Sequence, residues 1–428
     1  MMQQIDYPDF MQAVSLLARP TVDTSAQRAK VLAMLDAIKL EGDAAVQRFA
    51  LQFDGFVPDV LEASSDDFSW AEQQLSEDLK SAIRQAYSNI KRFHAAQQVQ
   101  EAPVETQPGV LCWRKTVPIE RVGLYIPGGT APLFSTALML GVPAQLAGCK
   151  EVVLCTPPQS DGKIHPAVLF AAGLCGIRRV FKLGGVQAIG AMAYGTAQVP
   201  RVWKIFGPGN LWVTVAKQMV SLDGIAIDMP AGPSEVAVLA DAAAKTAYVA
   251  ADLLSQAEHG ADSQVLLLSD SAELLQKVAV ELADQLEKLP RKLFAAQALA
   301  QSKALLLHSM EEAMRWINAY APEHLIIQTA DATQLAEKVI NAGSVFIGPY
   351  TPESAGDYAS GTNHTLPTGG YARVSGGVAL DSFVKKITFQ QISEAGLQGL
   401  GPAVETMARA EGLEAHARAV SIRLDAKF

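Results

Sequence analysis

Cysteine is scarce in this 428-residue sequence, and no two cysteines are spaced as a CxxC pair. Four cysteines are too few to build a disulfide framework in a chain of this length. The sequence therefore predicts reduced, buried thiols at Cys112, Cys149, Cys155 and Cys175.

Charge is also in short supply, since charged residues make up 18% of the chain and acidic residues outnumber basic ones, for a formal net charge of −9. An acidic surface repels nucleic acid and anionic membrane, so we expect neither partner and favour small-molecule chemistry. The chain is long enough to bury a large core and to divide into two or more domains. Its first residues lack a basic segment followed by an apolar one, which predicts a cytoplasmic protein.

Two uncharged stretches, residues 122–149 and 183–200, are long enough to cross a bilayer. Prolines and glycines interrupt both of them. This punctuation is typical of short buried strands and helices joined by tight turns, so we expect no membrane span.

Hydrophobic periodicity changes along the chain. The first hundred residues read as helical, with one apolar face formed by Leu79, Ile83, Ala86, Ile90 and Phe93. Beyond residue 117, short β-rich runs alternate with alanine-rich helical segments, which predicts a parallel sheet wrapped by helices. The runs are 151–155, 179–183, 235–239, 264–268 and 344–347. From about residue 382 the pattern is again helical, and this tail reads as a separate small unit.

The sequence also lacks the GxGxxG fingerprint of nicotinamide enzymes, because its nearest match places Trp212 where the third glycine belongs. Three glycine-rich turns, at 125–129, 183–190 and 206–210, each follow an expected strand. Such turns can bring backbone N–H groups and helix N-termini close to a phosphate. A plain structural turn is the commoner use of glycine, so both interpretations stay open here.

The seven histidines occur in different settings. His94 and His165 are expected to be solvated and His308 to be packed. Gln256 precedes His259 by three residues, so the two would share a helix face and could both reach a metal. A polar helix end facing water is the alternative, since glutamine is an uncommon zinc ligand.

Two further acid and imidazole pairs stand out in the second half of the chain. Glu323 and His324 follow a proline and could act as proton-transfer groups of different basicity, although a helix start with a first-turn Glu fits equally well. Glu411 and His416 are five residues apart, so one must lie at a helix end if both serve one site.

A third candidate segment is the loop around Asp357, which is polar, glycine-rich and also carries His364. Loops of this composition often present binding groups from a rigid scaffold, while an ordinary surface turn is the alternative.

Taken together, several of these segments resemble the histidinol dehydrogenase family along nearly the whole chain. Several separated motifs in a fixed order are far more specific than any single motif. The stretches that carry the resemblance are RVGLYIPGGTAPLFSTALML, LGGVQAIGAMAYGT, IFGPGN, DMPAGPSEV, LLSQAEHG, APEHL, ESAGDYASGTNHTLPTGGYAR and EGLEAHA.

The resemblance implies a set of site residues. Catalysis would fall to Glu323 and His324, and substrate contacts would add Ser234, His364 and Glu411. One Zn²⁺ per subunit would be held by four residues, which also line the substrate site: Gln256, His259, Asp357 and His416. Two successive molecules of NAD would be held by Tyr125, Gln187 and Asn210.

The resemblance also implies an α/β fold similar to that of aldehyde dehydrogenases, with two incomplete Rossmann-like domains and small, mainly helical terminal domains. The expected division is a helical arm at 1–24, a larger domain at 25–125 and 236–380, an inserted NAD-binding domain at 126–235, and a C-terminal domain at 381–428. That last domain would reach the partner subunit of a domain-swapped homodimer.

The implied reaction is the NAD-dependent oxidation of L-histidinol through L-histidinal to L-histidine. Zinc would orient the substrate, His324 would take protons in both steps, and Glu323 would activate a water molecule. The alternatives are a zinc- and NAD-dependent dehydrogenase of another amino alcohol, and a metal-binding protein without turnover.

Overall fold

The computed structural model describes residues 1–19, 24–55, 60–128, 132–229 and 232–425. These residues form two compact units. Unit 1 consists of residues 1–96 and 119–383, and unit 2 consists of residues 97–118 and 384–428.

Unit 1 contains a six-stranded, wholly parallel sheet in the order β1-β11-β10-β9-β12-β13. Its central strands are buried on both faces, as near-continuous apolar runs require. The strands are β1 (Gln3–Asp6), β9 (Glu235–Ala240), β10 (Gln264–Ser269), β11 (Lys303–Leu306), β12 (His324–Gln328) and β13 (Ser344–Ile347).

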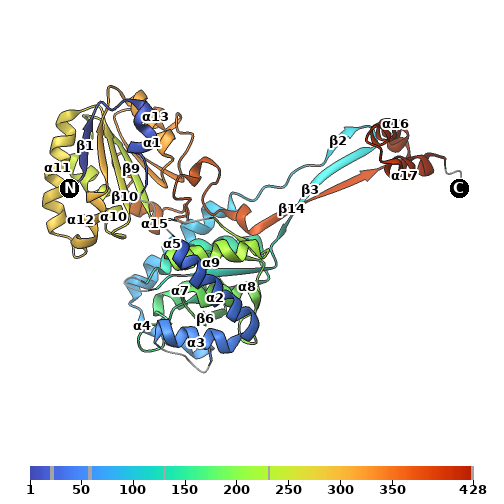
Figure 1. Ribbon diagram of the computed structural model, residues 1–428, viewed down its shortest axis with the longest axis horizontal. Coiled ribbons are helices and arrows are strands. Elements are labelled where there is room, and N and C mark those ends of the chain that lie inside the picture. Colours follow the sequence, from blue (N-terminus) through green and yellow to red (C-terminus); the bar gives the residue numbers. More distant parts are fainter. Residues whose placement is uncertain (20–23, 56–59, 129–131, 230–231, 426–428) are drawn as a thin grey trace. The chain divides into compact units, whose positions relative to one another are not determined.

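Helices cover both faces of this sheet, and Figure 1 shows α11 and α12 on one side with α1 and α13 on the other. The first face carries α10 (Thr246–Ala257), α11 (Ala272–Glu287) and α12 (Lys292–Ala300). The second carries α1 (Ala13–Leu16), α13 (Met310–Tyr320) and α14 (Ala332–Ala336). Three short helices, η1 (Phe10–Gln12), α15 (Glu353–Tyr358) and η2 (Tyr371–Arg373), lie in the connections.

A second parallel sheet in unit 1 has the order β6-β5-β4-β7-β8. Its strands are β4 (Arg121–Tyr125), β5 (Glu151–Thr156), β6 (Arg179–Lys182), β7 (Lys204–Phe206) and β8 (Ala226–Ile227). One face packs against α4 (Ser65–Gln74), α5 (Glu77–Ala95), α6 (Phe134–Ala147), α7 (Pro166–Leu174) and η3 (Leu380–Phe383). The other face packs against α2 (Ser25–Glu41), α3 (Asp43–Asp54), α8 (Gly185–Tyr194) and α9 (Leu211–Leu222).

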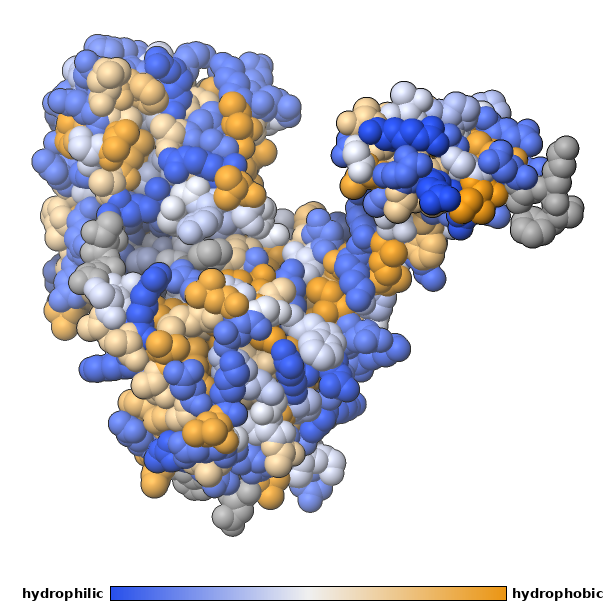
Figure 2. All heavy atoms as spheres, turned by 45° about the vertical axis from the view of Figure 1, so that its right-hand side comes forward, coloured by the Kyte–Doolittle hydropathy of each residue, from blue (hydrophilic) through white to orange (hydrophobic). Residues whose placement is uncertain are grey.

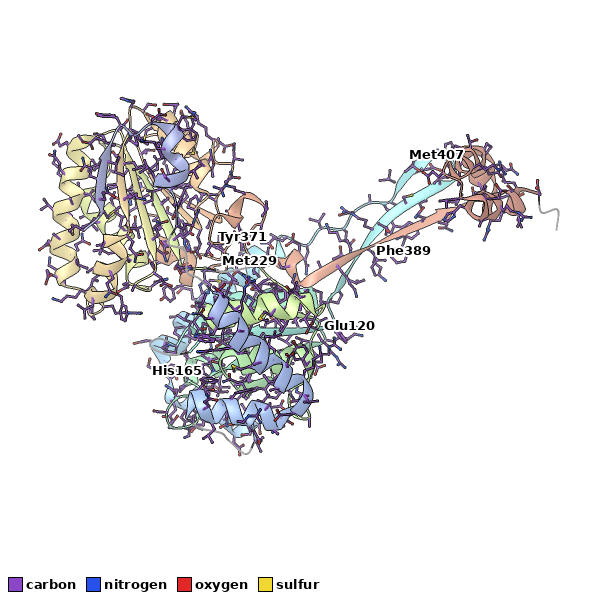
Figure 3. The ribbon with its side chains drawn as sticks, viewed as in Figure 1. Glu120, His165, Met229, Tyr371, Phe389 and Met407 are labelled. Carbon is purple, nitrogen blue, oxygen red and sulfur yellow. The ribbon has the colours of Figure 1, made fainter. Side chains whose placement is uncertain are left out.

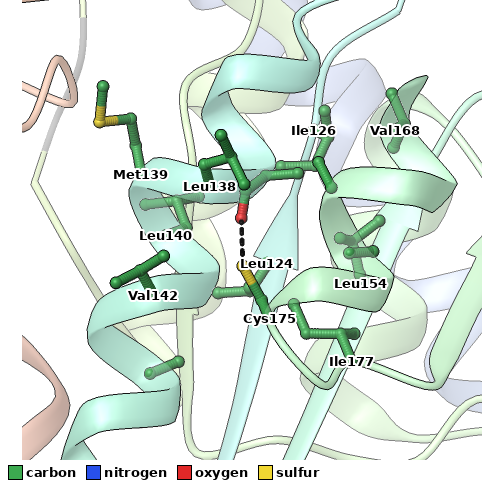
Figure 4. Close-up of a cluster of buried hydrophobic side chains, with 14 of the residues drawn as sticks. Leu124, Ile126, Leu138, Met139, Leu140, Val142, Leu154, Val168, Cys175 and Ile177 are labelled. Atoms are coloured by element: carbon green, nitrogen blue, oxygen red, sulfur yellow. Dashed lines mark hydrogen bonds between the residues drawn. The ribbon is translucent and has the colours of Figure 1, made fainter. Parts of the chain in front are cut away.

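The core under α6 and α7 is a large cluster of buried apolar side chains. Figure 4 shows leucine, isoleucine and valine side chains from both helices and from β4 and β5 packed around Cys175. The Cys175 thiol donates to the carbonyl of Ala137 at 3.8 Å, and burial raises the pKa of this thiol to about 12. All four cysteines are free, as the sequence predicts, with Cys155 and Cys175 fully buried and Cys112 and Cys149 partly buried.

Unit 2 joins two distant parts of the sequence in one antiparallel sheet of order β14-β3-β2. Its elements are β2 (Val104–Gln107), β3 (Val110–Pro118), β14 (Val384–Ile392), α16 (Glu394–Ala410) and α17 (Glu414–Asp425). The β3–β14 register runs from Val110 opposite Ile392 to Pro118 opposite Val384. Few side chains of unit 2 are buried, and apolar patches show on its surface in Figure 2. Phe389 and Met407, labelled in Figure 3, are two of its exposed apolar residues.

The alternation predicted from the sequence is confirmed, because all five predicted β-runs form strands of parallel sheets. Helices also dominate residues 25–95. Two segments predicted to be helical are strands instead, namely residues 3–6 and 384–392. Both are edge strands, whose polar exposed residues give no clear period-2 signal.

The histidine predictions need correction. His94 is fully buried on the inner face of α5, while Phe93 is 46% exposed. Both positions lie one turn beyond the buried Ile90, so periodicity cannot choose between them. His165 is half-buried and caps α7, where it accepts from the Ala167 N–H. His308 is exposed and stacks on Tyr7 rather than entering the core.

The grouping of segments also differs from the expected division. Residues 25–95 and strand β4 pack with the sheet of residues 126–235, not with that of residues 236–380. The C-terminal unit includes residues 97–118 in addition to the tail. An apolar helix face predicts burial but does not specify which sheet it covers. No helix among the described residues is long and apolar enough to span a membrane.

Candidate active site

The candidate site lies at the amino-terminal edge of the six-stranded sheet, where β9 and β12 begin. His324, the first residue of β12, is aligned with Val236 of β9. A helix that follows a strand in a parallel sheet runs back to the strand's starting edge. The end of α10 therefore brings Gln256 and His259 to the edge where Ser234 and Glu323 lie.

A left-handed turn delivers the acid and imidazole pair to this edge. Helix α13 ends at Ala321, whose φ of 54° is one of two positive values among the described non-glycine residues. Pro322 and Glu323 follow, and β12 starts at His324. The predicted proline-stiffened turn is thus present, and the alternative of a helix start is wrong.

Backbone groups of Glu235 orient both members of the pair. The Glu235 N–H donates to Glu323 Oε2 at 2.9 Å, and the Glu235 carbonyl lies 3.2 Å from His324 Nδ1. A carbonyl can only accept, so His324 carries a hydrogen on Nδ1. Its Nε2 lies 3.4 Å from Asp357 Oδ1.

Carboxylates surround the His324 ring. Burial opposes protonation of His324, but the charges of Glu353, Glu323 and Asp357 outweigh it and raise its pKa to about 10. Burial raises the pKa of Glu323 to about 7 and that of Glu353 to about 8. Against the opposing effect of burial, His324 holds the pKa of Asp357 below its usual value. The site therefore holds more acid than one imidazolium can balance, a setting that suits a cation.

Three side chains converge closely enough to hold a metal ion. One ligand atom each from His259, Glu353 and Asp357 lies within 4.8 Å of the others. Gln256 is fully buried, and its Oε1 accepts no hydrogen bond from a described residue. Glu353 Oε2 is likewise buried without a described donor. A buried oxygen without a donor is costly unless it meets an ion or water. The mixed nitrogen and oxygen set is compatible with a divalent cation such as Zn²⁺.

His364 connects this cluster to helix α6. Its Nδ1 lies 2.8 Å from the Asp357 carbonyl, and its Nε2 lies 3.1 Å from Thr136 Oγ1. Because Nδ1 faces a carbonyl, the neutral ring donates there and accepts from the threonine hydroxyl. Burial lowers the pKa of His364, so the neutral ring is the favoured form.

A cavity of about 370 Å³ extends from this cluster to helix α9. Its lining includes Ser234 and His259 at the sheet edge and Gly209 and Asn210 at the start of α9. One space therefore connects a candidate metal ligand with a helix N-terminus, the kind of position that favours a phosphate group.

The glycine-rich turns beside β4 and β7 are closely interlocked. A Cβ atom on Gly207, where φ is 120°, would collide with the Tyr125 carbonyl, so this turn requires glycine. The Tyr125 hydroxyl accepts from the Gly185 N–H at 3.0 Å, and Gln187 donates to Asp54 at 3.0 Å. Both Tyr125 and Gln187 are buried. The last glycine of the 125–129 turn, Gly129, lies outside the described residues.

Asn210 is the N-cap of α9, and its Oδ1 accepts from the Val213 N–H at 3.2 Å. Its amide nitrogen faces no protein acceptor among the described hydrogen bonds of this segment. Asn210 therefore combines a capping role with a free donor at the cavity wall.

The structure does not gather all the predicted residues in unit 1. Glu411 is the C-cap of α16 and His416 lies in the first turn of α17, both exposed in unit 2. Glu411 thus lies at a helix end, as a site shared with His416 would require. In unit 1, α10 ends at Ala257, so His259 lies beyond the helix, although its Nδ1 is still 3.5 Å from Gln256 Nε2.

Sequence reasoning missed Glu353 and Glu235. Glu353 opens the short helix α15 one turn before Asp357, so an i, i+4 pair of acids was the available signal. Glu235 meets Glu323 and His324 through its backbone, and no side-chain pattern could indicate such contacts.

Comparison with known proteins gives one consistent result. The sequence profile of the histidinol dehydrogenase family matches residues 17–424. The histidinol dehydrogenase of Bacteroides thetaiotaomicron is 57% identical over 425 residues, which cover 99% of each chain. That of Colwellia psychrerythraea is 52% identical over 417 residues, covering 97% of this chain and 96% of the other. The crystal structure of histidinol dehydrogenase from Elizabethkingia anophelis is similar with a TM-score of 0.97 and 52% identity, covering 99% of this chain and 98% of that one.

Proposed function

The chain belongs to the histidinol dehydrogenase family, and we propose that it catalyses the NAD-dependent oxidation of L-histidinol, through L-histidinal, to L-histidine. This reaction would complete histidine biosynthesis, in the cytoplasm. The observation that carries the proposal is the buried Glu323–His324 pair beside the cluster of His259, Glu353 and Asp357. An alcohol oxidation needs a base beside an orienting group, and this edge of the sheet supplies both.

The donor set fits a zinc ion. Gln256, His259 and Asp357 would hold it from one chain, with His416 supplied by a second copy. The orphaned, buried Gln256 Oε1 supports this assignment, because an ion would satisfy it. When bound, zinc supplies a Lewis acid that orients the amino alcohol.

The turns of the second sheet fit a dinucleotide, with Tyr125, Gln187 and Asn210 as the residues that hold it. Support comes from the close packing of Gly207 on Tyr125 and from the cavity that reaches the start of α9. When bound, NAD supplies the hydride acceptor.

The orientation of His324 assigns its role. With Nδ1 directed at the Glu235 carbonyl, Nε2 of the neutral ring is the atom that takes the hydroxyl proton of the alcohol. A divalent cation on the acidic cluster would offset the carboxylate charges that raise the pKa of His324, and so would favour the neutral ring. Glu323, held by the Glu235 N–H, takes a proton from water as that water adds to the aldehyde carbon. The resulting hydrate anion loses a hydride, the second of the whole reaction, and becomes a carboxylic acid. His324, having released its first proton to solvent, accepts the proton of this acid, which leaves a carboxylate.

Ser234 and His364 complete the substrate contacts within unit 1, together with the zinc ligands and His324. Glu411 and His416 would come from the partner of a domain-swapped homodimer. The exposure of both residues on unit 2 leaves them free to serve such a site.

The stoichiometry of the reaction tests the function. Purified protein loaded with zinc should release two NADH for each L-histidinol consumed, with L-histidine as the product. NADH release only with another amino alcohol would favour a related dehydrogenase. Bound zinc without any NADH would indicate a metal-binding protein without turnover.

Subunit complementation tests the shared site. His416→Ala and His324→Ala chains are mixed and refolded, so that about half the dimers are mixed, each with one intact site of two. Activity should recover to about a quarter of wild type from two nearly inactive parents. If each tail served its own chain, every site would keep one lesion and no recovery would occur.

A further inference from the structure

A buried ion pair lies directly beneath the catalytic pair and belongs to no part of the proposed reaction. Arg19 Nε and Nη2 donate to the two carboxylate oxygens of Glu235 at 2.5 and 2.8 Å. The Glu235 side chain is only 3% exposed and that of Arg19 is 20% exposed. The two parallel hydrogen bonds give the pair a defined geometry as well as charge balance.

The same guanidinium also reaches the turn that precedes the catalytic pair. Arg19 Nη2 donates to the Tyr320 carbonyl at 2.8 Å and to the Ala321 carbonyl at 3.3 Å. The group stacks on the Tyr320 ring at 4.0 Å from its centroid. A left-handed alanine persists only where its surroundings hold it, and Arg19 binds this turn through the carbonyls of Tyr320 and Ala321.

Glu235 is therefore held at its side chain by Arg19 while its backbone holds the catalytic groups. Its N–H fixes Glu323 and its carbonyl fixes the ring of His324. Gly369, in the loop that carries His364, donates its N–H to Glu235 Oε1 at 2.8 Å. One carboxylate thus joins the N-terminal segment, the start of β9 and the substrate loop.

We propose that Arg19, acting through Glu235, is a positioning residue for Glu323 and His324, an inference that rests on the proposed function. Arg19 is neither one of the described residues that line the cavity nor a member of the acidic cluster. Arg19 holds the start of β9 and the turn that leads into β12 in their relative positions. Small errors at such a site matter, since a displacement of about 1 Å can slow a reaction about 10²-fold.

Kinetics of the full-length, zinc-loaded enzyme test the proposal. Arg19→Met keeps the apolar stem on Tyr320 but removes every donor. We expect kcat for L-histidinol to fall about 10²-fold, with the KM values for substrate and NAD within about twofold. Arg19→Lys restores a charge without the planar fork and should recover part of kcat.

Two further variants separate positioning from folding. Arg179→Met is the control, because Arg179 also makes a bidentate pair with a glutamate, Glu62, and it begins β6 in the other sheet. It should lower the thermal midpoint while leaving kcat unchanged. In a Glu235→Gln background, adding Arg19→Met should lower kcat much less than Arg19→Met does alone, since both changes break the same ion pair.

The outcomes are distinct. A wild-type enzyme that does not oxidise L-histidinol overturns the proposed function, and this inference with it. An active wild type with unchanged kcat in Arg19→Met, or a loss equal to that in Arg179→Met, overturns the inference alone. If Arg19→Met does not fold, Arg19→Lys decides, because an unchanged kcat in that variant also counts against the proposal.

Discussion

The two parallel sheets of unit 1 each place a buried ion pair beside a turn, but the two pairs hold different groups in position. Beside β7, Lys217 and Asp228 lie 2.5 Å apart with side chains 4% and 2% exposed. Lys217 donates to the Gly207 carbonyl and Asp228 accepts from the Gly207 N–H, each at 2.7 Å. That pair fixes a glycine turn and no titratable group.

In the other sheet, the Arg19–Glu235 pair fixes two titratable side chains, which stand among further acids. The contrast is chemical. A turn that binds phosphate through N–H groups needs only its backbone shape, and glycines with one buried ion pair supply it. Acid–base groups also need the correct tautomer and a balance of charge, and several elements must converge to supply these.

Removing a cation from the acidic cluster should have the largest effect on activity, because the cluster lies at the edge of the six-stranded sheet and would hold the metal there. Chelation should abolish turnover and leave far-UV circular dichroism nearly unchanged, since the ligands join elements of a preformed core. Readdition of Zn²⁺ should restore activity. A loss of helical signal on chelation would mark the ion as structural instead.

Substituting the pair itself should come next. His324→Ala should slow both oxidations about 10² to 10⁴-fold if it supplies base catalysis. Glu323→Gln should chiefly slow the step from L-histidinal, because only that step needs water. Supplying L-histidinal directly to each variant separates the steps, and equal impairment of both steps in Glu323→Gln would contradict this division.

A change on the nucleotide side should affect binding more than chemistry. Asn210→Ala removes a free donor at the cavity and should raise the KM for NAD about tenfold, in line with the loss of one hydrogen bond. Ser271→Ala is the matched control, because Ser271 caps α11 with the same kind of bond to the Leu274 N–H. Loss of a cap costs about 1 kcal/mol in both variants. If both variants raise the KM equally, the effect is capping alone.

The smallest effect concerns His94, which is buried on α5. Burial lowers its pKa below 6.5 in the folded state. The unfolded chain then binds a proton below pH 6.5 that the folded chain does not, so the free energy of unfolding falls as pH falls, by at most about 1.4 kcal/mol per pH unit.

Thermal midpoints of wild type and His94→Met between pH 8 and pH 5.5 measure this contribution. The wild type should lose about 1–2 °C more than the variant over that range, given the size of the chain. Parallel curves for the two proteins would mean that His94 is protonated equally in both states.

Much of the fold could be predicted because its signals are local. Residues 265–268 are all apolar, and a short apolar run of this kind is typical of a strand buried on both faces in an α/β protein. The edge strands β1 and β14 were missed because their residues are exposed and carry no clear alternation. His94 was misplaced because positions 93 and 94 fit the helical period equally well.

Part of the candidate site was likewise within reach. The Gln256–His259 spacing and the Glu323–His324 pair are visible as neighbours in the chain, although their partners are not. The fold brings Glu353 close to His324, and the charge of Glu353 raises the pKa of the His324 ring. No sequence spacing between the two residues could have indicated this effect. The position of the site at the starting edge of the strands also departs from the usual position at their carboxyl ends.

The sequence by itself determined the α/β class, the free thiols and the family, because each follows from composition, from short-range periodicity or from motifs in a fixed order. Only the tertiary structure decided which helices cover which sheet, and that Arg19, Glu235 and Ala321 meet around one turn. Such meetings join residues hundreds of positions apart. They depend on how whole elements pack, and no local pattern of residues encodes that.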